Sequence, residues 1–494
     1  MGGAPAGLAG IVAALVLGWL VARWLLGGGW AGPRWSPTLI QISLGALFGP
    51  GIVSLACFLL LAAGIANPAT VWGVQAVLIA GAGALAFRPG PSNAPLSAPT
   101  GSWSWNWVLV IAVALGLAAL LAAFYATSSV NFDGDWDAFS IWNVRARYLA
   151  GGAATWKRAF GAEVGGRMVG ASHPGYPLLL SAFVAAEWIA AGAVTSAVNI
   201  AASLLFALAV LGVLVSSIGL RRGTALGLLA GLAFLSTDTF VAQAPGQYSD
   251  LPAALCFLAS LVLWESAVPS HSKRLFAAAG FAAGLAPWTK NEGWPFLIGF
   301  LAVAIWRARG AALWTVMGSL PGVVATIAMK VWLVQGTEAM FPTTARQAVS
   351  FLAQPARWWA IAQAFAHGLW QLGALPWAHP ILLVAAVAFV AGVIPRPERA
   401  TRAWLLIPVA AVFAADYGVF VLSTADLTWH LGTSVDRLIL QMWPSLLFVA
   451  FLMVQPLEDV KLNMNASAAR GSRARPDRGA KFAGDKAVSP RTRA

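Results

Sequence analysis

Long apolar runs separated by short polar breaks cover most of the 494-residue chain. A helix needs about 17–25 apolar residues to cross a bilayer, where every backbone polar group must be paired within the element. On the order of a dozen runs meet this length. The first, residues 5–27, is expected to be a retained span, because no small-residue cleavage site follows a basic stretch there. The pattern predicts an all-α polytopic integral membrane protein with about 11–14 transmembrane helices.

Composition agrees with this prediction, since 59% of the residues are hydrophobic and only 10% are charged. Cys57 and Cys256 lie inside apolar runs, so we expect them to be packing residues rather than a disulfide or a metal pair. Much of the net charge of +13 lies in short loops and in residues 458–494, a basic segment too polar to fold. We expect that segment to be a disordered cytoplasmic tail rather than a nucleic-acid-binding arm.

Lysine and arginine in short loops mark the cytoplasmic side of a membrane protein. Such marks occur at Arg221 and Arg222 and in the stretches 271–274, 306–309 and 395–402. Counting crossings from these marks puts four other segments on the outer face: 244–250, 289–293, 336–357 and 426–437. The chain then divides into N-terminal helices (1–104), a central module (105–310), C-terminal helices (311–457) and the tail (458–494).

The same count predicts one large outer loop, residues 127–192, with helices of its own. An odd number of crossings must separate this loop from Arg221, yet two apolar runs follow, 176–192 and 194–219. We expect the shorter run, 176–192, to lie along or dip into the outer interface. By the same argument, 358–394 is expected to hold one interfacial helix and one span.

The outer loop opens with three aspartates in the stretch 131-NFDGDWDAFSIWNVRARYLAGG-152. A helix at about 137–150 is expected to be amphipathic, with Phe139, Trp142 and Tyr148 set against Arg145 and Arg147. Other ionisable residues share the predicted outer face, many of them at the ends of spans, where such groups tend to be functional. The full outer set is Asp133, Asp135, Asp137, Arg145, Arg147, His173, Tyr248, Asp250, Lys290, Glu292, Arg346, His430, Asp436 and Arg437. Carboxylates from separate turns, with cations beside them, suit a site that handles a hydroxyl and a phosphate together.

The order of these motifs resembles the GT-C superfamily of polytopic glycosyltransferases, which includes protein mannosyltransferases and the lipid A aminoarabinose transferase. The first acidic outer motif and its helix are matched by 135-DWDAFSIWNVRARYLA-150, and a later His-Pro element by 173-HPGYPLLL-180. An acid opening a later span is matched by 247-QYSDLPAAL-255, and a following lysine turn by 289-TKNEG-293. The resemblance covers about 105–310 and implies transfer of a sugar from a polyprenyl phosphate to an acceptor hydroxyl.

The resemblance also implies roles for individual residues. Asp137 corresponds to the catalytic aspartate, with Asp135 as the second choice, because the sequence has Asp-x-Asp-x-Asp where the family has an Asp-Glu pair. Asp133 is expected to be a turn residue. Donor phosphate binding falls to His173, Lys290, Arg346, His430 and Arg437, and a second acid to Asp250 and Glu292, with Arg145, Arg147 and Tyr248 in support. A single base opposite the phosphate implies inversion at the anomeric carbon.

Other uses of these residues stay open at the level of the sequence. The acids could bind Mg²⁺ or Mn²⁺ through oxygen ligands, although no cofactor is certain and we favour catalysis without a metal. Asp436 and Arg437 could form a local ion pair. A polysaccharide polymerase or ligase would share the donor but place its key residues in a large late loop, and a secondary transporter would show an internal repeat. We expect a bacterial inner-membrane enzyme with a periplasmic site, a lipid, polysaccharide or protein acceptor, and no nucleic-acid partner.

Overall fold

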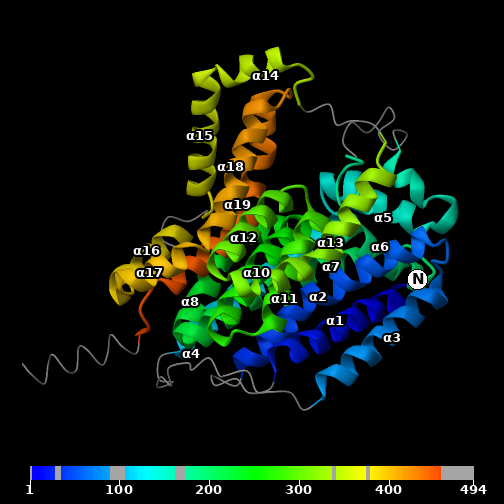
Figure 1. Ribbon diagram of the computed structural model, residues 1–494, viewed down its shortest axis with the longest axis horizontal. Helices are drawn as coiled ribbons and strands as arrows, with labels where there is room; N and C mark the ends of the chain where they lie inside the picture. Colours follow the sequence, from blue (N-terminus) through cyan, green and yellow to red (C-terminus); the bar gives the residue numbers. More distant parts are fainter. Residues whose placement is uncertain are drawn as a thin grey trace, which may run out of the picture.

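The computed structural model describes residues 3–27, 35–88, 106–161, 173–335, 341–373 and 379–457, and every element of regular structure in these ranges is a helix apart from one isolated β-bridge between Val393 and Val454 (Figure 1). The first half of the chain contributes α1 (Ala4–Leu26), α2 (Trp35–Ala62), α3 (Pro68–Ala86), α4 (Asn106–Val130), η1 (Ala138–Trp142), α5 (Asn143–Ala150), η2 (Gly152–Ala154), η3 (Trp156–Phe160), α6 (Leu179–Ala191), α7 (Ser196–Arg222) and α8 (Thr224–Leu235). The second half contributes α9 (Asp238–Gln243), η4 (Ala244–Gly246), α10 (Asp250–Ser270), α11 (Lys273–Thr289), α12 (Gly293–Arg307), α13 (Arg309–Trp332), α14 (Ala345–Leu352), α15 (Pro355–Trp370), α16 (Pro380–Ala391), α17 (Arg396–Ala403), α18 (Leu406–Leu422) and α19 (Leu427–Leu452). The predicted tail, 458–494, lies outside the described residues.

Eight described helices are long and apolar enough to cross a membrane, or up to ten if two bent pairs, α8 with α9 and η4, and α17 with α18, each count as one span. This agrees with a polytopic membrane protein but is fewer than the 11–14 spans predicted. The difference arises because three apolar runs form shorter helices, α6, α12 and α16, which fall below the roughly 20 residues that a straight span needs.

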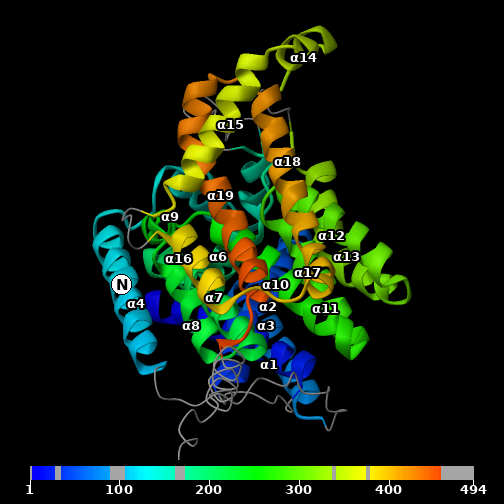
Figure 2. The same cartoon turned by 90° about the vertical axis from the view of Figure 1, so that its left-hand side faces the viewer.

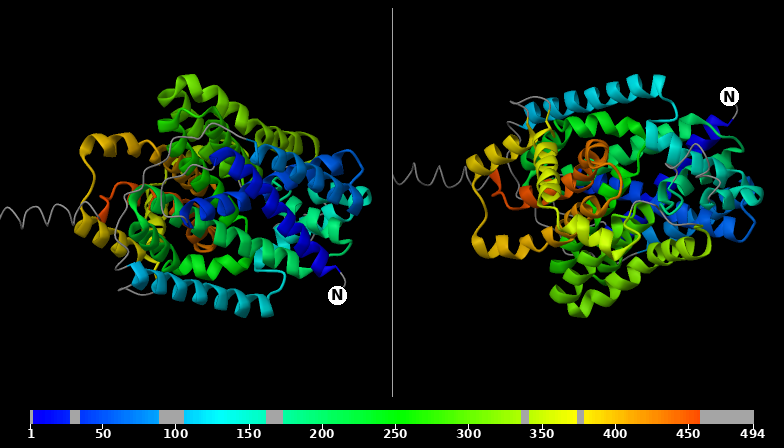
Figure 3. Two further views of the ribbon diagram at one scale, coloured as in Figure 1. Left: turned by 90° about the horizontal axis from the view of Figure 1, so that it is seen from below. Right: turned by 90° about the horizontal axis from the view of Figure 1, so that it is seen from above.

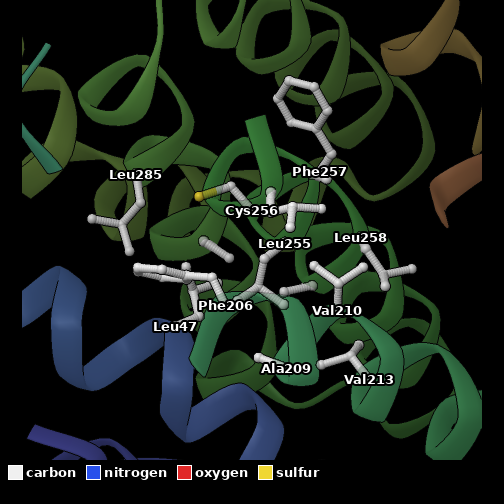
Figure 4. Packing of buried hydrophobic residues seen from close by; sticks show 14 of the residues in the cluster. Leu47, Phe206, Ala209, Val210, Val213, Leu255, Cys256, Phe257, Leu258 and Leu285 are labelled. Atoms are coloured by element: carbon white, nitrogen blue, oxygen red, sulfur yellow. The ribbon is translucent and has the colours of Figure 1, made fainter. Parts of the chain in front are cut away.

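The centre of the molecule is a helix bundle filled by apolar side chains from α2, α7, α10 and α11 (Figure 4). Leu47, Phe206 and Leu255 are among the fully covered residues, and Cys256 lies beside them. Cys57 and Cys256 are both buried free thiols on different helices, which confirms their predicted packing role.

Small residues let α11 and α13 pack closely against one another. The sequences 280-GFAAG-284 and 318-GSLPG-322 face one another, and a Cβ on Gly322 would lie only 2.1 Å from the carbonyl oxygen of Gly284. Membrane helices associate through such small-residue faces because lipid removes the hydrophobic drive between them. This close contact carries the Lys290 turn at the end of α11 alongside the end of α13.

The basic loop residues gather at one end of the bundle, here called the basic end. Arg222 and Arg402 both donate to the carbonyl oxygen of Leu452, and Arg402 lies 3.6 Å from Glu265. Glu265 is 15 residues from Asp250 on α10, which corresponds to ~22 Å along a helix. Asp250 and its neighbours therefore lie at the opposite end, here called the site end.

The run 176–192, predicted to lie along or dip into the outer interface, is covered by protein. Twelve of the 13 residues of α6 are buried, because α1, α2, α3 and α5 all pack around it. Its last turn lies beside the start of α1, where a Cβ on Gly3 would be 2.7 Å from that of Ala193. Thus α6 is a short helix inside the bundle rather than on its surface, and its length does not make it a candidate span, in keeping with the prediction that this run does not cross.

Two parts of the molecule stand apart from the bundle. The helices α14, α15 and the end of α18 project beyond its site end (Figures 1 and 2). Trp358, Trp359 and Tyr417 line an open groove of about 530 Å³ there. At the margin, α4 runs along one side and packs mainly on α8 (Figure 3). The loop that follows α4 carries the three aspartates.

Candidate active site

The three aspartates of the loop after α4 have three different partners. Gly134, with φ +79°, makes a left-handed turn between Asp133 and Asp135, a conformation that glycine adopts without strain. Asp133 turns toward Arg147, whose Nη2 lies 2.7 Å from its Oδ2 at an exposed position. Asp135 Oδ1 accepts a hydrogen bond from Asn131 Nδ2 at 3.3 Å. Asp137 Oδ2 accepts one from Arg437 Nη1 at 2.6 Å. Within the described residues no group of three His, Cys, Asp or Glu side chains is placed to hold a metal ion.

Gln247 fixes this loop against the rest of the site. Its backbone is left-handed, with φ 59°, and its buried amide oxygen accepts from Asn143 at 2.8 Å and from Asn199 at 2.6 Å. Its amide nitrogen donates to the carbonyl oxygen of Phe132. The backbone N–H of Asp135 donates to the carbonyl oxygen of Gly246. The aspartate loop is thereby joined to the turn that begins α10.

The helix after the aspartates is not amphipathic in the predicted sense. Its first turn is the π-helix η1, a form that recurs at functional sites, and α5 follows directly. Trp142 is buried and Arg147 is exposed, as predicted, but Arg145 is fully buried and Phe139 is exposed, the reverse of the expectation. The reason is that Arg145 donates to main-chain carbonyls of Tyr176 and Pro174 and lies over the ring of Phe160.

Asp250 is the most heavily bonded carboxylate of the site. It stands at the first residue of α10, where the helix dipole favours a negative charge. Its Oδ1 accepts from Lys290 at 3.0 Å and from Gln441 at 2.7 Å, and its Oδ2 accepts twice from Arg437, at 2.9 and 3.2 Å. With two donors on each oxygen, Asp250 orients cations and is poorly suited to act as a base or as a metal ligand.

Lys290 lies between two carboxylates. Its Nζ is 3.0 Å from Asp250 Oδ1 and 3.0 Å from Glu292 Oε1, and the residue is only 5% exposed. Burial alone would lower the pKa of Lys290, but the two carboxylates outweigh it and hold the pKa above its ordinary value. Lys290 therefore stays charged, and within the described residues these two contacts leave one of its three N–H groups over.

Arg437 ties the last helix to the aspartate loop. It bonds Asp137 through Nη1 and Asp250 through Nε and Nη2, and it lies 4.1 Å from the ring centre of Tyr248. Burial, the largest effect, and the nearby aspartates raise the pKa of Tyr248 to about 12, although Arg437 opposes them. A local pair with Asp436, one alternative open from the sequence, does not form, because Arg437 turns to these two aspartates instead.

The remaining predicted residues are placed unequally. His173 has φ 38° and stacks on Tyr176 at 4.7 Å, within electrostatic reach of His430. His430 lies with its Nδ1 3.0 Å from Ser423 Oγ. Arg346 is exposed on α14, at the tip of the projecting helices in both Figures 1 and 2, so the structure does not bring it to the cluster of Asp250 and Lys290.

Several residues of the site were not singled out from the sequence. Gln441 and Lys330 are polar groups on α19 and α13, and Asp416 is a 3%-exposed carboxylate on α18 with no partner for Oδ2 among the described residues. Asp416 is close enough to Glu292, Lys290 and Asp250 for their charges to interact. Each lies in an otherwise apolar run, and that isolation is the signal that could have found them.

Comparisons with family models, curated proteins and solved structures found no match for this chain. What the site can do therefore rests on its own geometry. It gathers carboxylates and cations from five separated segments of the chain at one end of an apolar helix bundle.

Proposed function

We propose that the protein is an inverting glycosyltransferase that moves a sugar from a polyprenyl phosphate to an acceptor hydroxyl at the outer face of a membrane. The observation that carries the proposal is Arg437 joining Asp137 to Asp250 beside Lys290. A carboxylate that can take a hydroxyl proton and cations that can hold a phosphate stand in one place.

The donor capacity of the cations supports a phosphate ligand. Within the described residues Arg437 uses three of its five N–H groups on the two aspartates, and Lys290 uses two of its three. The N–H groups that remain can bind phosphate oxygens as charge builds on the leaving group. We propose that His173 and His430, which are close enough for their charges to interact, add imidazole groups to the same phosphate site.

The aspartates have different roles in this proposal. Asp137 is the general base, because its carboxylate is 23% exposed and only one of its oxygens is bonded by a residue that the structure describes. Asp135, which has no ion pair within the described residues, is the alternative base or a helper that binds the acceptor hydroxyl. Asp250 holds Lys290 and Arg437 in place rather than reacting.

The location follows from the charge distribution. Loops rich in lysine and arginine are retained on the cytoplasmic side, so the basic end with Arg222 and Arg402 is proposed to face the cytoplasm. The site end would then face the periplasm of a bacterial inner membrane. A lipid-linked sugar and its acceptor would meet there.

Comparative analysis of cell envelopes tests this function. Glycolipids, glycans and glycoproteins from cells lacking the gene are compared by mass spectrometry with those from cells carrying the wild-type gene or Asp137→Ala. We expect one sugar to be missing from the deletion and from Asp137→Ala membranes, with the variant protein still inserted. Identical sugars in the deletion, wild-type and Asp137→Ala cells would overturn the proposed function. Full sugar transfer by both Asp137→Ala and Asp135→Ala would do the same. Adding a chelator to transfer assays tests the use of a divalent cation.

A further inference from the structure

Three consecutive carbonyl groups beside His173 are held by two cationic side chains. Arg145 donates to Pro174 O, at 3.4 Å, and to Tyr176 O, while Lys330 donates to Gly175 O at 2.8 Å. The two cations come from α5 and α13, which are far apart in the sequence. Hydrogen bonds from charged donors are stronger than neutral ones, so this turn, residues 173–176, is held firmly.

Lys330 also reaches the turn that carries Lys290. Its Nζ lies 2.9 Å from Oδ1 of Asn291, the residue directly after Lys290. Lys330 is the third residue from the end of α13, a long apolar helix, where an ionisable group is costly unless it has a use. The ammonium group of Lys330 thus links the turn after His173 to the turn that carries Lys290.

The position of His173 depends on this turn. Its backbone is left-handed, with φ 38°, which is unusual for a residue other than glycine and must be imposed by its surroundings. Its ring stacks on Tyr176 at 4.7 Å, and Tyr176 stacks on Trp142 at 5.6 Å. The carbonyl of Tyr176 is one of the two that Arg145 holds. Fixing this turn therefore also fixes the Tyr176 ring on which the His173 imidazole stacks.

We propose that Lys330 is a positioning residue that sets the position of His173 relative to Lys290. Arg145 holds the same turn, residues 173–176, through two other carbonyl groups. The distance between the imidazole and the Lys290 ammonium is then fixed before any ligand arrives. The catalytic consequence, a preformed pair of phosphate donors, rests on the proposed function. The claim that Lys330 positions His173 does not depend on the proposed function.

Histidine modification tests the positional claim without turnover. Purified protein is treated with diethyl pyrocarbonate, and the modification of His173 is measured by mass spectrometry relative to His271, an exposed residue near the basic end. We expect Lys330→Met to raise this ratio roughly tenfold, the change that accompanies loss of one charged hydrogen bond. Lys330→Arg, which keeps a donor at the same place, should restore most of the wild-type ratio.

Two further variants make the test decisive. Arg402→Met removes a cation that likewise donates to a carbonyl oxygen, but at the basic end, and should leave the ratio unchanged. Asn291→Ala removes only the link to the Lys290 turn and should raise the ratio by a smaller factor, even if Lys330→Met does not fold. An unchanged ratio in Asn291→Ala, or in folded Lys330→Met, would overturn the proposal.

The result can be separated from that of the envelope analysis. If His173 becomes more reactive but no sugar is missing from the deletion strain, the positioning role stands and the transferase assignment fails. If transfer is established, Lys330→Met should lower kcat more than it changes KM, and Lys330→Arg should recover activity. A purely structural role would lower the amount of folded protein in both variants and leave the His173 ratio of the folded fraction unchanged.

Discussion

Asp137 Oδ2 lies 2.6 Å from Arg437 Nη1, although 300 residues separate the two along the chain. The contact joins the loop after α4 to the middle of α19, the last described helix. It neutralises one oxygen of the proposed base while the other stays unbonded. In the proposed mechanism, phosphate binds the N–H groups of Arg437 that this contact leaves over, so Arg437 would hold the base and the leaving group next to one another.

The aspartates should respond differently to removal of their charge. Asp137→Asn is expected to lower sugar transfer by a factor of roughly 10²–10⁴, the usual contribution of a general base. Asp133→Asn is the matched control, because it loses only the exposed pair with Arg147, worth about 0–1 kcal/mol. Transfer rates in membranes with equal amounts of each protein measure the difference. Equal losses in both variants would contradict the assignment of Asp137.

Asp250 should be the most important of these carboxylates for stability. Asp250→Asn leaves Lys290 and Arg437 buried without their shared counter-ion, so we expect a loss of about 3–5 kcal/mol. Glu398→Gln, which breaks an exposed pair with Arg402, should cost about 0.3–0.5 kcal/mol. Unfolding in detergent micelles measures both. Adding Lys290→Met to Asp250→Asn should recover part of the loss, and purely additive losses would argue against a shared charge cluster.

Gly134 should be sensitive to a single added methyl group. In Gly134→Ala the new Cβ would meet Ala138 Cβ at 2.6 Å and Gly246 O at 2.7 Å, at φ +79°. Gly152→Ala is the control, because φ is +67° but the nearest atom is 4.0 Å away. Both carry the left-handed strain of about 1–2 kcal/mol. Only Gly134→Ala should also disturb the aspartate loop, and limited proteolysis of the folded variants compares them. Equal cleavage would contradict the role of close packing.

Tyr248 should remain protonated at pH values where ordinary tyrosines ionise. Its pKa is raised to about 12 by burial first and then by the nearby aspartates. The stability from its neutral state is full below pH 10 and is lost as the pH rises from 10 toward 12. Absorbance at 295 nm, taken as wild type minus Tyr248→Phe, should show no transition between pH 9 and 11. A difference transition near pH 10 would contradict the buried position of this phenol.

The ends of α6 and α11 offer a test of orientation. Ala193 is exposed next to the start of α1, and Lys273 is exposed at the start of α11. We expect Ala193→Cys to react with an impermeant maleimide from the outside of intact cells and Lys273→Cys only after the membrane is opened. The native cysteines are buried and provide a low background. Labelling of both from one side would mean that the assigned sides, or the path of α6, are wrong.

Hydrophobic run length predicted the helical architecture, and the basic residues predicted only that Arg222 and the 395–402 loop share one side of the membrane. They also picked out Asp137, Asp250, Lys290 and Arg437 as candidates, because charges at the ends of apolar runs are conspicuous. The structure brings these four together. No local pattern could have shown that Arg437 would turn to Asp137 and Asp250 rather than to its neighbour Asp436.

Other features depend on contacts that the sequence does not encode locally. An apolar run such as 179–191 looks the same whether lipid or protein covers it, so the buried position of α6 was missed. Arg145 looked like a polar-face residue because its partners are main-chain carbonyls, which carry no sequence signature. Lys330 was detectable as a lone charge in a span, but its partners at Gly175 and Asn291 were not.

The late position of Arg437 in the chain has a consequence for biosynthesis. A membrane protein is made and inserted from its N-terminus, so Asp137 and Asp250 are synthesised before α19, the helix that carries Arg437, their shared partner. Until α19 is inserted, these groups have an incomplete set of contacts. A truncated product, or a C-terminal fusion that hinders α19, should therefore be inactive even when all earlier helices are correctly inserted.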